Sequence, residues 1–235
     1  MAAMNPRSKD RPAGRTVVFA FGIAIVAAAA LVAAALLLRD DSSTAVTESP
    51  VVSLSGIPQD GRVLGSPAAN VTLVEWADPQ CPACRTYTEE FFPAVVDGYV
   101  RTGTVKTEFR GFPFIGEDSV TAYRFLLAAG EQNRLWDLQE AMYRNQGGEN
   151  EGWVTDELVR ELAAGIEGLD VDQLFADAQR EDIVAEAEGA EAIAQEAGIP
   201  GTPTLQIAIG DDEPYTIQVA TIEQMQAALD DALAG

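Results

Sequence analysis

The sequence predicts an α/β domain that contains a long helical block, preceded by one N-terminal transmembrane helix. Three observations lead to this prediction. The apolar run at residues 71–77 is typical of a buried strand, and a Cys-x-x-Cys motif at residues 81–84 and a segment of helical periodicity follow it. Residues 118–197 have the pattern of helices separated by glycines. Residues 16–38 carry no charged side chain, as expected for a membrane span.

The N-terminal part is expected to anchor the chain. Residues 1–15 are polar and mostly basic and predict a cytoplasmic tail. Residues 16–38 would form a helix of roughly 34 Å at ~1.5 Å per residue, and a bilayer core is about 30 Å thick. Because basic residues precede this segment and acidic residues 40–41 follow it, we expect a single-pass protein of the cell membrane whose domain is extracytoplasmic.

A cleaved signal peptide is the alternative. Alanines 33–35 would be the small-residue cleavage site in that case, but leucines 36–38 follow them and the apolar run exceeds the ~7–15 residues that are usual in signal peptides, which favours an uncleaved anchor. Either way the domain lies outside the cytoplasm, where disulfides persist. Residues 39–61, rich in Ser, Thr, Pro and Gly, predict a linker with a short strand or turn near its end, and the domain is expected over residues 62–235.

The strand at residues 71–77 is interrupted by Glu75. Side chains alternate along a strand, so Glu75 lies on the same face as Val71 and Leu73. Its carboxyl group is either at a strand end in contact with water or buried with a raised pKa. We expect Asp78 in the solvated turn that follows.

The segment after the motif predicts a helix whose apolar face holds Tyr87, Phe91, Val95 and Tyr99. Pro93 should kink this helix, because proline lacks the backbone N–H that a helix interior uses. Its end is expected at Gly103. A second strand over residues 105–109 and a turn at residues 111–114 follow.

The rest of the domain is mostly helical. Helices are predicted over residues 118–129, 134–145, 155–164, 171–179 and 180–198, with Thr155 or Asp156 as one N-cap. A Gly/Pro-rich turn at residues 198–204 then leads into a strand over residues 205–209. A hairpin turn at residues 210–214 leads into a strand over residues 215–219, and Thr221 is expected to cap a last helix over residues 222–233.

The strongest candidates for chemistry are Cys81 and Cys84, the only two cysteines of the chain. If Cys81 is an N-cap, Pro82 takes the first helical position, where its missing N–H costs nothing. Cys81 then faces the free N–H groups and the positive end of the helix dipole, and both favour its thiolate. Cys84, one turn further, should be more buried. We therefore expect Cys81 to attack, Cys84 to resolve, and the pair to cycle between dithiol and disulfide.

Three other interpretations of the cysteines stay open. A zinc site needs about four ligands, and a chain with two Cys and no His would have to add carboxylates or a second chain. A structural disulfide over so short a loop adds little stability, and free cysteines are often simply buried.

The composition excludes other function classes. The lack of His excludes Ser-His-Asp and Cys-His catalysis, and the net charge of −22 argues against nucleic-acid binding.

Four segments together resemble the DsbA-like branch of the thioredoxin superfamily. They are Val74-Glu75-Trp76-Ala77-Asp78 before the Cys-x-x-Cys motif, Phe109-Arg110-Gly111-Phe112-Pro113, Gly130-Glu131-Gln132 and Gly201-Thr202-Pro203-Thr204. The resemblance covers residues 62–235 and implies a thioredoxin fold in which residues 118–197 are the family's helical insertion. Membrane-tethered members of this kind occur in bacteria that lack a true periplasm.

The resemblance implies roles for further residues. Cys81 and Cys84 match the family's redox pair, and Glu75 matches an acidic position beneath the resolving cysteine, where a carboxyl group relays a proton. Pro203 matches a proline that is cis in the family and packs beside the disulfide. Thr202, which precedes it, and Pro82 and Ala83 between the cysteines are expected to contact substrate. Pro79 stands where relatives often carry an aromatic residue, which changes the local surface.

Together these observations predict an extracytoplasmic thiol-disulfide oxidoreductase that introduces disulfides into secreted or membrane proteins. The resemblance implies cysteine-containing clients and a quinone-linked membrane reoxidant of DsbB or VKOR type. We expect a monomer without cofactor or metal. A reductase or isomerase using the same pair, and a non-catalytic peptide-binding module with a structural disulfide, are the alternatives. The oxidase is favoured because whatever stabilises the Cys81 thiolate stabilises the reduced form.

Overall fold

The computed structural model describes residues 52–235. The predicted cytoplasmic tail (1–15), the predicted transmembrane segment (16–38) and most of the predicted linker lie outside the described residues. Within residues 52–235, no helix is both long enough and apolar enough to cross a membrane.

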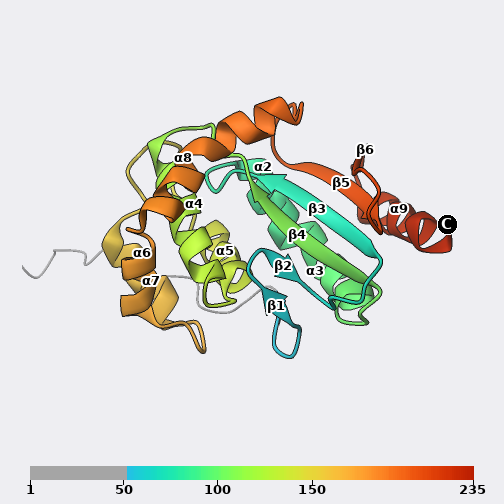
Figure 1. Ribbon diagram of the computed structural model, residues 1–235, viewed down its shortest axis with the longest axis horizontal. Helices are drawn as coiled ribbons and strands as arrows, with labels where there is room; N and C mark the ends of the chain where they lie inside the picture. Colours follow the sequence, from blue (N-terminus) through green and yellow to red (C-terminus); the bar gives the residue numbers. More distant parts are fainter. Residues whose placement is uncertain (1–51) are drawn as a thin grey trace, which may run out of the picture. The chain divides into compact units, whose positions relative to one another are not determined.

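A six-stranded sheet with helices around it forms the domain (Figure 1). The strand order is β1-β2-β4-β3-β5-β6, and only the β3–β4 pair is parallel. The strands are β1 (Gln59–Asp60), β2 (Val63–Leu64), β3 (Val71–Ala77), β4 (Val105–Gly111), β5 (Thr204–Ile209) and β6 (Tyr215–Ile217). The helices are α2 (Pro82–Thr86), η1 (Tyr87–Phe91), α3 (Phe92–Val95), η2 (Val96–Val100), α4 (Glu117–Gly130), α5 (Leu135–Arg144), α6 (Asp156–Ala164), α7 (Val171–Asp177), α8 (Glu181–Glu196) and α9 (Ile222–Ala234).

Strand β3 lies at the centre of the sheet and is buried along its whole length. It runs parallel to β4 and antiparallel to β5, and Trp76 near its end pairs with Thr204 at the start of β5. This register places the Thr202–Pro203 segment beside the turn that follows β3. The sheet thereby brings together two segments that are more than a hundred residues apart in the sequence.

Apolar side chains cover both faces of β3. Val74 and Trp76 pack with Phe112, with Ala194 of α8 and with Ile199. The opposite face contributes to the larger core, in which Val71, Leu73 and Ala77 pack with Cys84 and with residues of the insertion. The near-continuous apolar character of residues 71–77 is thus explained by burial on both sides.

The helical segment after β3 differs in detail from the prediction. It is continuous from Pro82 to Val100, but two π-helical turns, η1 and η2, flank α3. Pro93 lies at the start of α3, where the π-helical turn before it accommodates the missing N–H. The wider turn also shifts the buried face: Phe92 is buried and Phe91 is only partly buried, whereas helical periodicity predicts Phe91 on the apolar face.

The helical insertion agrees with the prediction to within a few residues at each helix end. Its helices α4 to α8 lie together at one side of the sheet (Figure 1). The Thr155 hydroxyl accepts a hydrogen bond from the Leu158 N–H, so Thr155 and not Asp156 is the N-cap of α6. The Thr221 hydroxyl caps α9 in the same way by accepting from the Gln224 N–H.

The folded part begins before residue 62, the predicted start of the domain. Val52, Leu54 and Ile57 are buried and belong to the large core, and β1 lies at residues 59–60. These residues fall within the predicted linker over residues 39–61, whose few apolar side chains gave no periodic signal.

Candidate active site

Cys81 and Cys84 lie at the start of the helical segment that follows β3. Cys81 is the N-cap of α2, with φ −71° and ψ 119°, and Pro82 follows within the first helical turn, as predicted. Both cysteines are free thiols. Cys84 is fully buried, whereas Cys81 is 7% exposed, and Pro82 and Ala83 between them are exposed. Of the two sulfurs, Cys81 is therefore the one that a partner can reach.

The Cys81 thiol has a pKa lowered from 9.0 to about 6. The largest cause is a hydrogen bond from the Cys84 thiol, and a hydrogen bond from the Thr202 hydroxyl and the backbone N–H groups of Ala83 and Cys84 add to it, against the opposing effect of burial. Burial raises the pKa of Cys84 well above its usual value. Near neutral pH, Cys81 is a thiolate and Cys84 keeps its proton.

The second segment of the site is Thr202–Pro203, and its peptide bond is cis, as the resemblance implied. The Cys81 thiol donates to the Thr202 carbonyl oxygen with an Sγ···O distance of 3.4 Å. Within the described part of the chain, the buried Thr202 hydroxyl has no partner while Cys81 is a thiol, so it is free to bond the thiolate. The antiparallel β3–β5 register produces this contact.

Glu75 is buried, which decides between the two environments that the sequence left open. Its side chain is 1% exposed on the core face of β3, and burial raises the pKa of its carboxyl group from 4.5 to about 8. A hydrogen bond from Gln139 of α5 partly opposes this rise. The charges of Glu75 and Cys84 act on each other, since Glu75 contributes to the raised pKa of Cys84.

Asp78 is buried, and the expectation of a solvated turn was wrong. Its carboxylate accepts hydrogen bonds from the Gln80 N–H (2.8 Å), the Ser119 hydroxyl (2.5 Å) and the Ile115 N–H (2.9 Å). Burial raises the pKa of Asp78 and these bonds oppose the rise. A carboxylate with this many donors can stay buried where a free one could not.

Sequence reasoning missed several polar residues that surround the motif. Gln80 is buried immediately before Cys81, and Gln146 and Asn150 approach the same turn from the loop after α5. Gln139 reaches Glu75 from α5. No local pattern marks these residues, because each of them acts on a partner that is distant in the sequence.

A groove of about 300 Å³ lies beside the cysteines. It is formed by residues of the motif helix, the cis-proline segment and β6, and its lining is Ala83, Thr86, Tyr87, Phe91, Pro203, Thr204, Leu205, Thr216, Ile217, Gln218 and Val219. Pro203, which follows the Thr202 carbonyl group that Cys81 contacts, therefore lines the groove.

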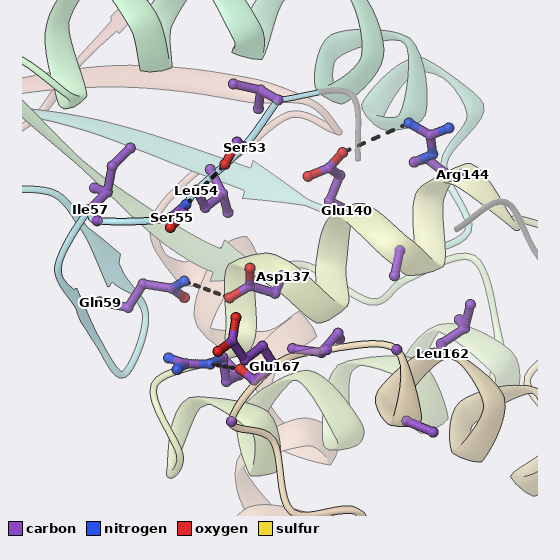
Figure 2. A pocket seen from close by; sticks show the side chains of 18 of the residues that line it. Ser53, Leu54, Ser55, Ile57, Gln59, Asp137, Glu140, Arg144, Leu162 and Glu167 are labelled. Carbon is purple, nitrogen blue, oxygen red and sulfur yellow. Dashed lines mark hydrogen bonds and ion pairs between the residues drawn. The ribbon is translucent and has the colours of Figure 1, made fainter. Parts of the chain in front are cut away.

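A larger pocket of about 980 Å³ lies elsewhere, between the lead-in to β1 and helices α5 and α6 (Figure 2). Gln59 donates to Asp137 within it at 2.6 Å, and Glu140 lies 4.0 Å from Arg144. No cysteine lines this pocket, and its lining shares no residue with the groove. We therefore place the thiol chemistry at the groove.

Comparison with known proteins agrees with this geometry. A family model described as Thioredoxin matches residues 58–231. The chain belongs to the thioredoxin family. Within that family, a probable disulfide bond formation protein D of Bacillus cereus is 31% identical over 151 residues, which are 61% of this chain and 68% of the relative.

Solved structures of thioredoxin-family proteins share the fold. Oxidised BdbD from Bacillus subtilis matches 76% of this chain and 98% of its own with a TM-score of 0.64 and 25% identity. The α-DsbA1 of Wolbachia pipientis gives the same TM-score at 20% identity, over 78% of this chain and 94% of its own, which supports the fold alone. The Bacillus relatives and the Cys81–Cys84 pair together show that this thioredoxin-family protein is a thiol-disulfide oxidoreductase.

Proposed function

We propose that this protein is a disulfide oxidase that acts outside the cytoplasmic membrane on cysteine-containing client proteins. The observation that carries the proposal is the large difference between the two thiols: the pKa of Cys81 is lowered to about 6 and that of Cys84 is raised. A stabilised thiolate stabilises the reduced enzyme, and a stable reduced form makes the disulfide a stronger oxidant. The Bacillus relatives named for disulfide bond formation agree with this direction.

The proposed reaction begins with the Cys81–Cys84 disulfide. A client thiolate attacks Cys81, the S–S bond breaks, and Cys84 leaves with the electron pair. A second client thiolate then attacks the client sulfur of the mixed disulfide and releases Cys81 as a thiolate. The client loses two electrons and two protons; the enzyme pair gains the two electrons and one proton, which ends on Cys84, and the other proton goes to solvent. Cys81 is favoured as the attacked sulfur because it is the accessible one. As the more acidic thiol it is also the better leaving group in the second step, in which the client disulfide is released.

Glu75 is the proposed proton donor to Cys84 in the first step. Cys84 leaves into a buried site, where its high pKa requires a proton at once. A carboxyl group with a pKa of about 8 holds a proton at neutral pH and can give it up to a stronger base. The same group would take the proton back when the enzyme is reoxidised.

The client is proposed to bind in the groove beside the cysteines. Pro203 and Ala83 line it, and exposed Pro82 and the Thr202 backbone border the Cys81 sulfur. An extended peptide that lies there would present a cysteine to Cys81 and pair with backbone groups. The mixed apolar and hydroxyl lining suits many client sequences, which a general oxidase requires.

The remaining parts of the proposal rest on the sequence. Residues 16–38 would anchor a monomer in the cell membrane with the domain outside, and residues 1–15 would stay in the cytoplasm. A quinone-linked membrane protein of DsbB or VKOR type would reoxidise the pair there. The anchor would keep the domain close to that membrane partner.

The deciding experiment is equilibration of the protein with glutathione buffers. We expect a reduction potential above about −180 mV, and a value near −270 mV, as in thioredoxin, would contradict the oxidase and favour a reductase. A second measurement follows the oxidation of reduced ribonuclease by the oxidised protein. The Cys81→Ser variant is the control and should be inactive. A peptide-binding module with a structural disulfide would leave ribonuclease reduced.

A further inference from the structure

The side chain of Gln80, directly before Cys81, is buried and fully hydrogen-bonded. It is 1% exposed. Its amide nitrogen donates to the Ser119 hydroxyl at 3.0 Å and to Asn150 Oδ1 at 3.2 Å. Its amide oxygen accepts from the Asn150 N–H at 2.7 Å and from Trp153 Nε1 at 3.4 Å. An amide group has two donors and two acceptor sites, and this one uses all four.

The same bonds join the turn before Cys81 into a closed network. Ser119 donates to the Asp78 carboxylate, which also accepts from the Gln80 N–H. The Asp78 carbonyl oxygen accepts from the Cys81 N–H at 2.9 Å and from the Tyr143 hydroxyl at 3.1 Å. The backbone on the N-terminal side of Cys81 is therefore fixed at each residue from Asp78 onward.

The partners of this turn come from the helical insertion. Asn150 and Trp153 lie in the loop after α5, and Ser119 lies in the first turn of α4. From the same loop Gln146 donates to the Pro79 carbonyl oxygen at 2.8 Å and to the Cys81 carbonyl oxygen at 3.3 Å. The insertion thus contacts the cysteine motif through side chains that never touch the sulfurs.

Close packing holds Asn150 in place. Its backbone has a φ of 58°, which non-glycine residues rarely adopt, and its side chain also donates to the Ile115 carbonyl oxygen at 3.0 Å. A Cβ atom on Gly116 would lie 2.0 Å from Asn150 Oδ1, so only glycine leaves room for this side chain. The loop is built around a single position of the Asn150 amide.

We propose that Gln80 is a positioning residue through which the insertion holds Cys81 at the N-terminus of its helix. The inference rests on the proposed function, because it concerns the reactivity of the same sulfur. Thiolate stabilisation requires Cys81 Sγ to face the N–H groups of Ala83 and Cys84 and the hydroxyl of Thr202. One peptide bond separates Gln80 from Cys81, so a fixed Gln80 restricts where the Cys81 backbone, and with it Sγ, can lie relative to these groups. Loss of its amide would also leave donors of Asn150 and Trp153 unpaired.

Other groups near Cys81 are charged or titrate. Cys84 on α2, Glu75 on β3 and Tyr143 on α5 interact with Cys81 electrostatically, and Asp78 lies in the preceding turn. None of these groups is altered when Gln80 is replaced by an uncharged side chain. A change in the titration of Cys81 in such a variant therefore reports on position and not on charge.

The test compares Gln80→Met, which keeps the volume and removes all four hydrogen bonds, with the wild-type protein. The alkylation rate of the reduced protein is measured against pH, together with thermal unfolding. We expect the titration midpoint of Cys81 to rise by roughly one pH unit from about 6. Equilibration with glutathione at pH 7 should then shift about fivefold towards the oxidised enzyme, because the reduced form has lost thiolate stabilisation.

The matched control is Gln132→Met. Gln132 also uses both ends of its amide, donating to the Asp170 carbonyl oxygen at 3.1 Å and accepting from the Asp170 N–H at 2.8 Å. These bonds tie parts of the insertion together away from the cysteines. The control should leave the Cys81 midpoint unchanged. If Gln80→Met lowers thermal stability but also leaves the midpoint unchanged, Gln80 is structural only and the inference is wrong.

Asn150→Ala provides a second variant in case Gln80→Met does not fold. It should shift the midpoint in the same direction, and the double variant should shift it little further than Gln80→Met alone, because both remove one network. An unchanged midpoint in a folded Asn150→Ala protein contradicts the inference. Failure of the proposed function gives a different result: wild-type protein would not oxidise ribonuclease, while the midpoint would still respond to Gln80.

Discussion

At the residue scale, the pKa values of the two cysteine thiols are shifted in opposite directions. Cys81 has a lowered pKa of about 6, and the largest cause is the hydrogen bond from Cys84. Cys84 has a raised pKa because it is buried, and the hydrogen bond to Cys81 and the charge of the Cys81 thiolate raise it further. The spacing of two residues makes this possible, since it places both sulfurs on the first turn of one helix.

A pair of substitutions tests the Cys84 hydrogen bond. Cys84→Ala removes the donor and should raise the Cys81 midpoint above about 6, while Cys84→Ser keeps a hydroxyl donor and should give a lower midpoint than Cys84→Ala. The alkylation rate against pH measures both. Equal midpoints in the two variants would show that a hydrogen bond from residue 84 does not lower the pKa of Cys81.

Burial of Glu75 predicts how stability depends on pH. Its pKa is raised from 4.5 to about 8, so the folded state binds more protons than the unfolded state between these values. The free energy of unfolding should therefore fall as pH rises from about 4.5 to about 8, at up to roughly 1.4 kcal/mol per pH unit.

The measurement is urea unfolding of the oxidised protein, in which neither cysteine titrates. Glu75→Gln should flatten the pH dependence and slow thiol exchange, because the proton donor is lost. Gln139→Leu is the comparison: it removes the hydrogen bond that lowers the Glu75 pKa, so the decline should extend to higher pH. A wild-type protein with no decline would contradict the buried, protonated carboxyl group.

Between elements, Asp78 connects the end of β3 to the start of α4. Its carboxylate accepts from Ser119 and Ile115, and its carbonyl oxygen accepts from Cys81 and Tyr143. Strand β3, helix α2 and helices α4 and α5 therefore meet at one residue. The turn that carries the cysteines is held by these hydrogen bonds as well as by the apolar packing of Cys81 and Cys84 in the core.

Asp78→Asn tests this connection. One carboxylate oxygen accepts from the Gln80 N–H and Ser119 and the other from the Ile115 N–H, so an amide NH₂ group in either place would face a donor. We expect a loss of about 1–3 kcal/mol in the free energy of unfolding. Asp170→Asn, at the exposed N-cap of α7, is the matched control and should cost little, because asparagine also caps helices. Equal losses in both variants would argue against a special role for Asp78.

Across the whole molecule, the net charge of −22 is expected to influence which clients associate with the protein. A strongly acidic protein attracts basic partners and repels acidic ones over about a Debye length, ~8 Å at physiological salt. Local hydrogen bonds determine the pKa of Cys81. The net charge should therefore change the rate of association with clients and not the reactivity of the thiolate.

Two peptides with one cysteine each, one flanked by lysines and one by glutamates, measure this effect. At low salt the basic peptide should form the mixed disulfide roughly tenfold faster or more, and the difference should shrink in 0.5 M salt, a condition with a Debye length of about 4 Å. A difference that persists in high salt would point to specific contacts in the groove.

Sequence patterns alone determined the elements and the reactive pair. The strand at residues 71–77, Cys81 as N-cap, the helices of the insertion and the Thr221 cap depend on neighbours a few residues away, and such interactions are visible in periodicity and capping residues. The resemblance to DsbA-like proteins added the cis bond before Pro203, which the structure confirms.

Only the tertiary structure decided the environment of the site. Whether Glu75 is buried depends on the helices that cover β3, and Asp78 is buried because Ser119 and Ile115 supply donors from about forty residues away. The amide of Gln80 meets Asn150 across 70 residues of sequence. Strand register and the packing of the insertion create these contacts. Neither can be predicted from the residues next to the cysteines, because the partners are distant in the sequence.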